Sequence, residues 1–126
     1  MTFLVDTNVF LEILLRRAKK DSCKRFLDEN IGQLNITDFS LHSIGVILFR
    51  YQKRELFNEF IKDAIPRVDL LSLPLGNYSD LMEANGNPGL DFDDAYQYCV
   101  AKHYGLDIAT LDKDFEKVKD IVVRFM

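Results

Sequence analysis

Aspartates stand at the ends of apolar segments in two distant parts of the chain. Asp6 directly follows the apolar run 3–5, and Asp112 comes shortly after a second run, 106–110. Asp94 lies near the start of a mostly apolar segment, 92–104. Carboxylates gathered without nearby cysteine or histidine are hard oxygen ligands, which favour Mg²⁺ or Mn²⁺ over zinc. The pattern indicates metal-assisted chemistry on a phosphoryl group.

Each of these acids also has a purely structural explanation. Asp6 can cap a helix, Asp93 or Asp94 can complement a helix dipole, and Asp112 can stabilise an Asx-turn. It is less plausible that all three explanations hold at once. Several independent crossovers would then each have to place a carboxylate at the same edge of the sheet. Carboxylates crowded at that edge repel one another unless a cation is present.

Strands and helices are predicted to alternate along the whole chain, which we interpret as a single domain, 1–126. Short apolar runs predict strands, and apolar residues at helical spacing predict helices. Such alternation favours an α/β fold with a mainly parallel sheet between layers of helices. The expected strands are 3–5, 34–36, 68–71, 106–110 and 121–125; the expected helices include 22–29, one capped by Thr37 or Asp38, 55–64, 78–84 and 92–104.

Composition and charge exclude several classes of protein. The net charge of −4 argues against a DNA-binding domain that relies on a basic face. No apolar run approaches the roughly 18 residues of a membrane span, and no secretory leader is visible, so we expect a cytoplasmic protein with no membrane contact. Cys23 and Cys99 are too few for a disulfide framework and are expected to be buried, inert thiols.

Other side chains that can do chemistry are assigned to the core or to a surface. Cys99 and His103 are four residues apart and can chelate a soft metal, but no second pair completes a zinc site. His42 is a possible base, although a lone histidine among apolar residues is more often a core or partner-facing side chain. Five phenylalanines at helical apolar positions are expected in the core rather than stacking on bases: Phe26, Phe39, Phe49, Phe57 and Phe60.

Three segments, in this order, resemble the PIN-domain ribonucleases, a family that includes the toxins of VapBC-type toxin–antitoxin pairs. The segments are Val5-Asp6-Thr7-Asn8-Val9, Asp94-Ala95 and Thr110-Leu111-Asp112-Lys113-Asp114-Phe115. The resemblance covers essentially the full chain. It implies a three-layer fold whose five-stranded parallel sheet has the order 3-2-1-4-5, with helices on both faces.

The resemblance also implies a function and a set of site residues. Asp6, Asp94 and Asp112 would hold Mg²⁺ or Mn²⁺ in an endoribonuclease that hydrolyses RNA phosphodiester bonds. Asn8 and Thr110 would orient metal-bound waters, and Asp114 is a further acid in the same segment. The implied partners are RNA and an antitoxin protein, and a homodimer is possible.

One position departs from the family pattern. Members usually carry a glutamate on the helix after the second strand, and here that position is Ser43. Ser43 can hydrogen-bond a metal-bound water, and Asp91 or Asp93 can supply the missing charge. The alternative function is a degenerate PIN-like module that binds RNA or a protein without cutting. A receiver-type signalling domain is a third hypothesis, but its acid should follow the third strand, whereas Asp69 lies within it.

Overall fold

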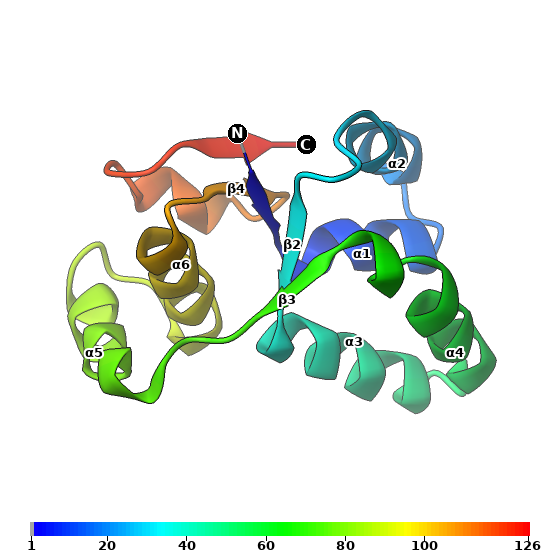
Figure 1. Ribbon diagram of the computed structural model, residues 1–126, viewed down its shortest axis with the longest axis horizontal. Coiled ribbons are helices and arrows are strands. Elements are labelled where there is room, and N and C mark those ends of the chain that lie inside the picture. Colours follow the sequence, from blue (N-terminus) through cyan, green and yellow to red (C-terminus); the bar gives the residue numbers. More distant parts are fainter. Residues whose placement is uncertain (1) are drawn as a thin grey trace.

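Five parallel strands form the centre of the computed structural model, which describes residues 2–126 (Figure 1). The strands are β1 (Phe3–Val5), β2 (Leu34–Thr37), β3 (Asp69–Leu71), β4 (Asp107–Thr110) and β5 (Val123–Phe125). They pair in the order β3-β2-β1-β4-β5, and every pair is parallel. The α/β fold and the strand order expected from the sequence are therefore confirmed.

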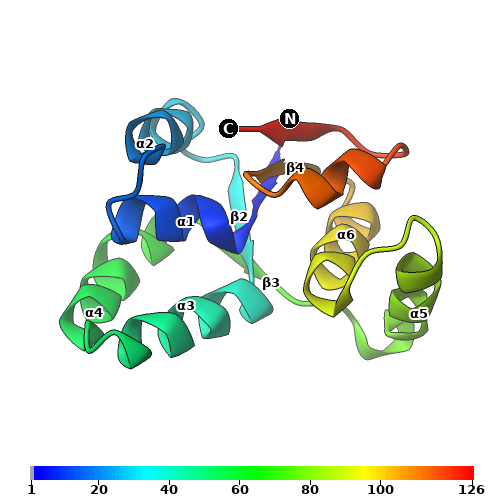
Figure 2. The same cartoon turned by 180° about the vertical axis from the view of Figure 1, so that it is seen from behind.

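Helices cover both faces of this sheet, which gives three layers (Figures 1 and 2). The first four helices pack on one face and the last two on the other. They are α1 (Thr7–Leu14), α2 (Lys20–Glu29), α3 (Asp38–Arg50), α4 (Arg54–Asp63), α5 (Ser79–Gly86) and α6 (Phe92–Tyr104), with short 3-10 turns η1 (Ile65–Arg67), η2 (Leu75–Asn77) and η3 (Lys113–Lys117). Within the described residues, no helix has the length and apolar character needed to span a bilayer.

The core divides into two parts because successive strand residues point to opposite faces of a sheet. In β1, Leu4 packs with α5 and α6, whereas Phe3 and Val5 pack with the helices of the other face. Cys23 and Cys99 are both buried and free, as the sequence predicted.

The assignment of all five helical phenylalanines to the core is wrong at one position. Phe26 and Phe60 are buried, but Phe49 is 59% exposed. Its neighbour Leu48 takes the inward position of α3, and the next residue along a helix is rotated by about 100° away from it. Phe49 packs its edge against Phe57 instead, with ring centroids 5.9 Å apart.

The carboxyl ends of β1 and β4 lie side by side. Val5 is paired with Ala109, and the Asp6 N–H extends the ladder by donating to the Ala109 carbonyl at 2.9 Å. The chain leaves β1 for α1 on one face of the sheet and reaches β4 from α6 on the other. Ligands of open α/β sheets bind at such a point, where the connections diverge.

Gly105 ends α6 in a left-handed conformation, with φ 68°. A side chain is strained there, so we expect Gly105→Ala to lower the free energy of unfolding by about 1 kcal/mol. Gly86 is the matched control, because it lies in α5 and an added Cβ would meet no atom within 4 Å. Gly86→Ala should leave stability unchanged or slightly higher in urea unfolding. Equal midpoints for wild type and Gly105→Ala would contradict the strain at this helix end.

Candidate functional site

A hollow of about 240 Å³ opens at the carboxyl edge of β1 and β4, between α1, α3 and α6. We call it the acid hollow. Its lining includes the three aspartates singled out in the sequence, so the fold brings together residues more than 100 positions apart. The lining residues are Asp6, Thr7, Asn8, Leu11, Phe39, Ser43, Ile47, Asp93, Asp94, Gln97 and Asp112.

Asp6 is both a helix cap and a wall of the acid hollow. It is only 6% exposed. One carboxylate oxygen, Oδ1, accepts from the Thr7 N–H at 2.8 Å and from Gln97 Nε2 at 3.0 Å, and Oδ2 accepts from the Thr110 hydroxyl at 2.7 Å. Burial raises the pKa of Asp6 despite these bonds, which favour the charged form. Three donors therefore fix the carboxylate in one orientation.

Gln97 connects Asp6 to α3 through a buried polar network that the sequence analysis missed. Its Nε2 also donates to the Ser40 hydroxyl, and its Oε1 accepts from the Thr37 hydroxyl at 2.9 Å. Ser40 accepts in addition from the Thr7 hydroxyl at 2.8 Å. The only sequence signal was a single amide within an otherwise apolar stretch of α6. Because each of these groups is paired, α1, α3 and α6 are held in register at the hollow.

Three carboxylates approach one another at the mouth of the acid hollow. One oxygen from each of Asp94, Asp112 and Asp114 can be chosen so that all three lie within 4.8 Å of one another. Asp94 is buried in the first turn of α6, whereas Asp114 is exposed and its N–H donates to Asp112 Oδ1 at 2.9 Å. An all-oxygen donor set of this kind fits Mg²⁺ or Mn²⁺. Asp114, which the sequence analysis gave only as a further acid in the segment of Asp112, thus joins Asp94 and Asp112 in one group of possible ligands.

Crowding and burial change the protonation of Asp94. Its pKa is raised to about 8, first by burial and then by the negative charges of Asp112, Asp91 and Asp6. An aspartate with this pKa holds a proton near neutral pH when no cation is present. The electrostatic environment therefore favours a positive charge in the acid hollow.

Asn8 and Thr110 hold the backbone beside the acids. Asn8 Oδ1 accepts from the Leu111 N–H at 3.1 Å, which ties α1 to the end of β4. The Thr110 hydroxyl, which donates to Asp6, accepts from the Asp112 N–H at 2.9 Å. Thr110 thus links the two aspartates that leave adjacent strands. Contact of Asn8 or Thr110 with metal-bound water stays a prediction.

Ser43 faces the acid hollow, together with Phe39 and Ile47 one turn before and one turn after it on α3. Of the two acids considered as replacements for the missing glutamate, Asp93 also lines the hollow. Asp91 does not line it; its carboxylate caps α6 by accepting from the Asp94 N–H at 3.0 Å. The replacement role of either acid stays a prediction.

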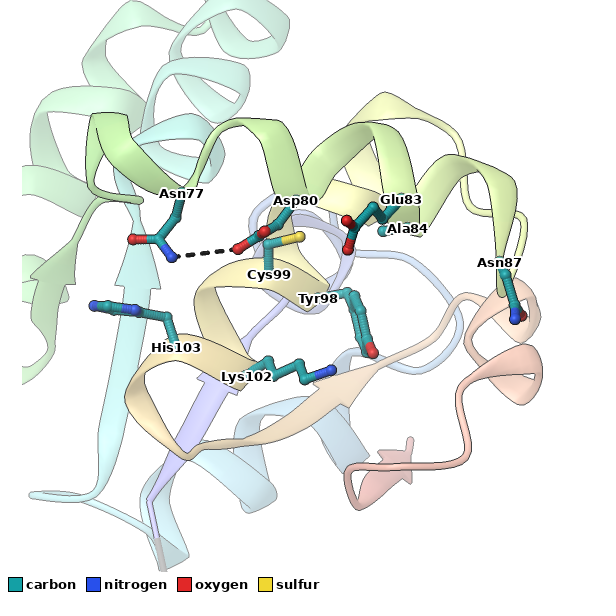
Figure 3. A pocket seen from close by; sticks show the side chains of 9 residues that line it. All are labelled: Asn77, Asp80, Glu83, Ala84, Asn87, Tyr98, Cys99, Lys102 and His103. Atoms are coloured by element: carbon teal, nitrogen blue, oxygen red, sulfur yellow. Dashed lines mark hydrogen bonds between the residues drawn. The ribbon is translucent and has the colours of Figure 1, made fainter.

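A second hollow of about 320 Å³ lies between α5 and α6 and contains Cys99 and His103 (Figure 3). In Figure 3 the Asn77 side chain donates to Asp80 at 3.2 Å near these two residues. Burial raises the Cys99 pKa to about 11, so the sulfur is a neutral thiol at ordinary pH. Among residues 2–126, the only group of three or more potential metal ligands is Asp94, Asp112 and Asp114, which disfavours a soft-metal site here.

The raised pKa of Asp94 predicts a pH-dependent stability in the presence of a chelator. The folded-state pKa of about 8 exceeds the ordinary value of 3.8, so between these values the folded state binds more protons than the unfolded state. The free energy of unfolding should therefore fall as pH rises from about 4 to about 8. In the Asp94→Asn variant the free energy of unfolding, measured in urea, should fall less over this pH window. The variant should be more stable than wild type at pH 8. If the free energy of unfolding depended on pH in the same way in both proteins, the pKa of Asp94 would not be raised by the fold.

The fold of this chain is similar to that of several solved toxin and toxin–antitoxin structures. A toxin–antitoxin complex from Klebsiella pneumoniae matches with 18% identity and a TM-score of 0.78, covering 96% of each chain. The Mycobacterium tuberculosis toxin VapC20, described as cleaving the Sarcin-Ricin loop, matches with 17% identity and a TM-score of 0.81, covering 98% of this chain and 99% of that one. VapBC2 from Rickettsia felis, bound to a DNA fragment from its promoter, matches with 14% identity and a TM-score of 0.79, covering 98% of each.

At these identities the structural matches establish the fold. No curated protein matches the chain by sequence. The sequence model of the PIN domain, however, matches residues 3–121. That match spans four of the five strands and every residue of the acid hollow, and the chain therefore belongs to the PIN-domain family.

Proposed function

We propose that this protein is a metal-dependent endoribonuclease that hydrolyses RNA phosphodiester bonds. The observation that carries the proposal is the acid hollow itself, in which Asp94 and Asp112 lie beside a buried Asp6 at the switch point of a PIN-domain sheet. Carboxylates crowded in this way repel one another, which destabilises the fold unless a cation offsets their charge. An oxygen-only site for a divalent cation beside an open hollow suits hydrolysis of a phosphodiester.

The chain's own residues have distinct tasks in this proposal. Asp94, Asp112 and Asp114 would hold Mg²⁺ or Mn²⁺, and Asp6 would present a carboxylate fixed by its three donors. The bound cation would supply Lewis acidity and lower the pKa of a water molecule. Asp94 would release its proton when the cation binds, because the positive charge removes the repulsion that raises its pKa.

The matched structures also bear on partners and assembly. Several are toxin–antitoxin complexes, which supports an antitoxin as the protein partner and makes this chain a candidate toxin. An apolar groove of about 460 Å³ between α3 and α4 is a suitable surface for a partner protein, because it exposes Val46 and Phe49. A homodimer stays a prediction.

The receiver-type alternative loses support from the position of Asp69. This residue begins β3, so it lies at the amino edge of the sheet, away from the acid hollow. The degenerate binding module is the competing function that must be tested, because it shares the fold but binds RNA or a protein partner without cutting.

Removing one carboxylate should separate a metal-dependent nuclease from a binding module. We expect Asp94→Asn to lose Mn²⁺ binding in calorimetry and to lower RNA cleavage by at least about 100-fold, the size of losing one electrostatic contact to a transition state. Asp107→Asn is the matched control, since Asp107 begins β4 at the opposite edge of the sheet. It should cleave and bind Mn²⁺ as wild type does. Wild-type protein that binds RNA without cutting it in Mn²⁺ would favour the degenerate module.

Ser43→Glu tests whether this α3 position belongs to the metal site. The side chain faces the acid hollow, so a glutamate there should add an oxygen ligand, tighten Mn²⁺ binding and raise cleavage. At ten times the dissociation constant, bound Mn²⁺ should add roughly 1.4 kcal/mol to the free energy of unfolding. A melting temperature lowered equally in Mn²⁺ and in chelator, with no gain in cleavage, would place Ser43 outside the metal site.

A further inference from the structure

A separate hollow, of about 230 Å³, adjoins the acid hollow and is lined mainly by aromatic rings. We call it the aromatic hollow. It shares Phe39 with the acid hollow, so one ring forms a wall of both. Its lining residues are Asp38, Phe39, His42, Tyr78, Phe92 and Tyr96.

The floor of the aromatic hollow is held rigidly. Tyr96 is 3% exposed, and its hydroxyl donates to Asp38 Oδ1 at 2.7 Å and accepts from the Leu73 N–H at 3.0 Å. The Phe39 ring lies 5.6 Å from the Tyr96 ring, between centroids. A hollow with fixed walls binds a rigid ligand without the entropic cost of ordering its own side chains.

Two aromatic rings at the rim of the aromatic hollow are exposed to solvent. Phe92 is 55% exposed and Tyr78 is 42% exposed, although each packs against a ring of the floor, Phe92 at 6.2 Å from Phe39 and Tyr78 at 6.1 Å from Tyr96. Exposed aromatic faces beside a polar site are the means by which proteins stack unpaired bases.

Polar groups at the edge of the aromatic hollow suit the polar edge of a nucleobase. The Asp38 carboxylate and the exposed His42 imidazole both line it and offer an acceptor and a ring nitrogen. His42 also lines the groove between α3 and α4, but that groove has no carboxylate, and its other lining residues are Leu41, Gly45, Val46, Phe49 and Phe57. A planar ligand with a polar rim therefore fits the aromatic hollow better than an apolar peptide side chain does.

We propose that an unpaired nucleobase of the RNA substrate stacks in the aromatic hollow while the adjoining phosphodiester lies in the acid hollow. The inference rests on the proposed function and adds to it a subsite for one base, which must be unpaired because a base within a duplex is already stacked and cannot enter. Phe92 precedes Asp94 by two residues on the first turn of α6, so one short segment contributes to both hollows.

The test uses a short single-stranded RNA in which each position in turn carries the fluorescent base 2-aminopurine. Binding is measured in Ca²⁺ by anisotropy, and stacking by quenching of the base. Phe92→Ala should weaken binding by about 10-fold and remove the quenching, as expected for loss of one base stack. Phe92→Tyr keeps an aromatic ring and should restore both.

Tyr51→Ala is the matched control, because Tyr51 is also an exposed aromatic residue, follows the last residue of α3 about three turns from Phe39, and lines neither hollow. It should bind the RNA as wild type does. The same RNA annealed to its complement should bind wild type and the control more weakly than the single strand does, should show no quenching that depends on Phe92, and should bind Phe92→Ala with little further loss.

The outcomes separate this inference from the nuclease proposal. Quenching that depends on Phe92, without any cleavage in Mn²⁺, would support base binding in the aromatic hollow and contradict the proposed nuclease activity. Cleavage with an unchanged KM in Phe92→Ala keeps the nuclease and overturns the inference, as does equal affinity for single strand and duplex. Those last results would favour a protein segment, and not a base, as the ligand of the aromatic hollow.

Discussion

Electrostatic repulsion at the carboxyl edge of β1 and β4 is the constraint on which the site depends. Parallel pairing of these two strands places Asp6 and Asp112 beside each other, and the first turn of α6 adds Asp94. Burial, and after it the charge of neighbouring carboxylates, raises the pKa values of both Asp6 and Asp94. A cation bound in the acid hollow would remove this repulsion, and the same carboxylates would then serve as its ligands.

A buried hydrogen-bond network allows the fold to tolerate these acids. Gln97 joins Asp6 to Ser40 and Thr37, and Thr110 joins Asp6 to the backbone of Asp112. Every buried side-chain nitrogen and oxygen in residues 2–126 has a hydrogen-bond partner. A fully paired network rigidifies its surroundings, so the positions of the carboxylates are set by α1, α3 and α6 together.

The beginning of α6 concentrates several tasks in four residues. Asp91 caps the helix, Phe92 exposes a ring at the aromatic hollow, and Asp93 and Asp94 line the acid hollow. Residues 94–101 of the helix are buried, which anchors this segment against β4 and α5. The proposed nuclease chemistry and the proposed base stacking therefore depend on one rigid element, and a shift of α6 would alter both.

The sequence alone determined the strands and the bounds of α6, and it placed the other helices it bounded to within two residues, because periodicity is a local property of the chain. The meeting of Asp6 with Asp112 followed only on the condition that their strands lie parallel in one sheet, and the strand order came through the family resemblance. Only the tertiary structure decided that Gln97 contacts Asp6 and that Asp114 approaches Asp94, since these contacts join distant segments. It also decided that Phe49 is exposed while Ser43 faces the acid hollow. Helical spacing shows which residues share a face, but the packing of neighbouring elements determines what that face contacts.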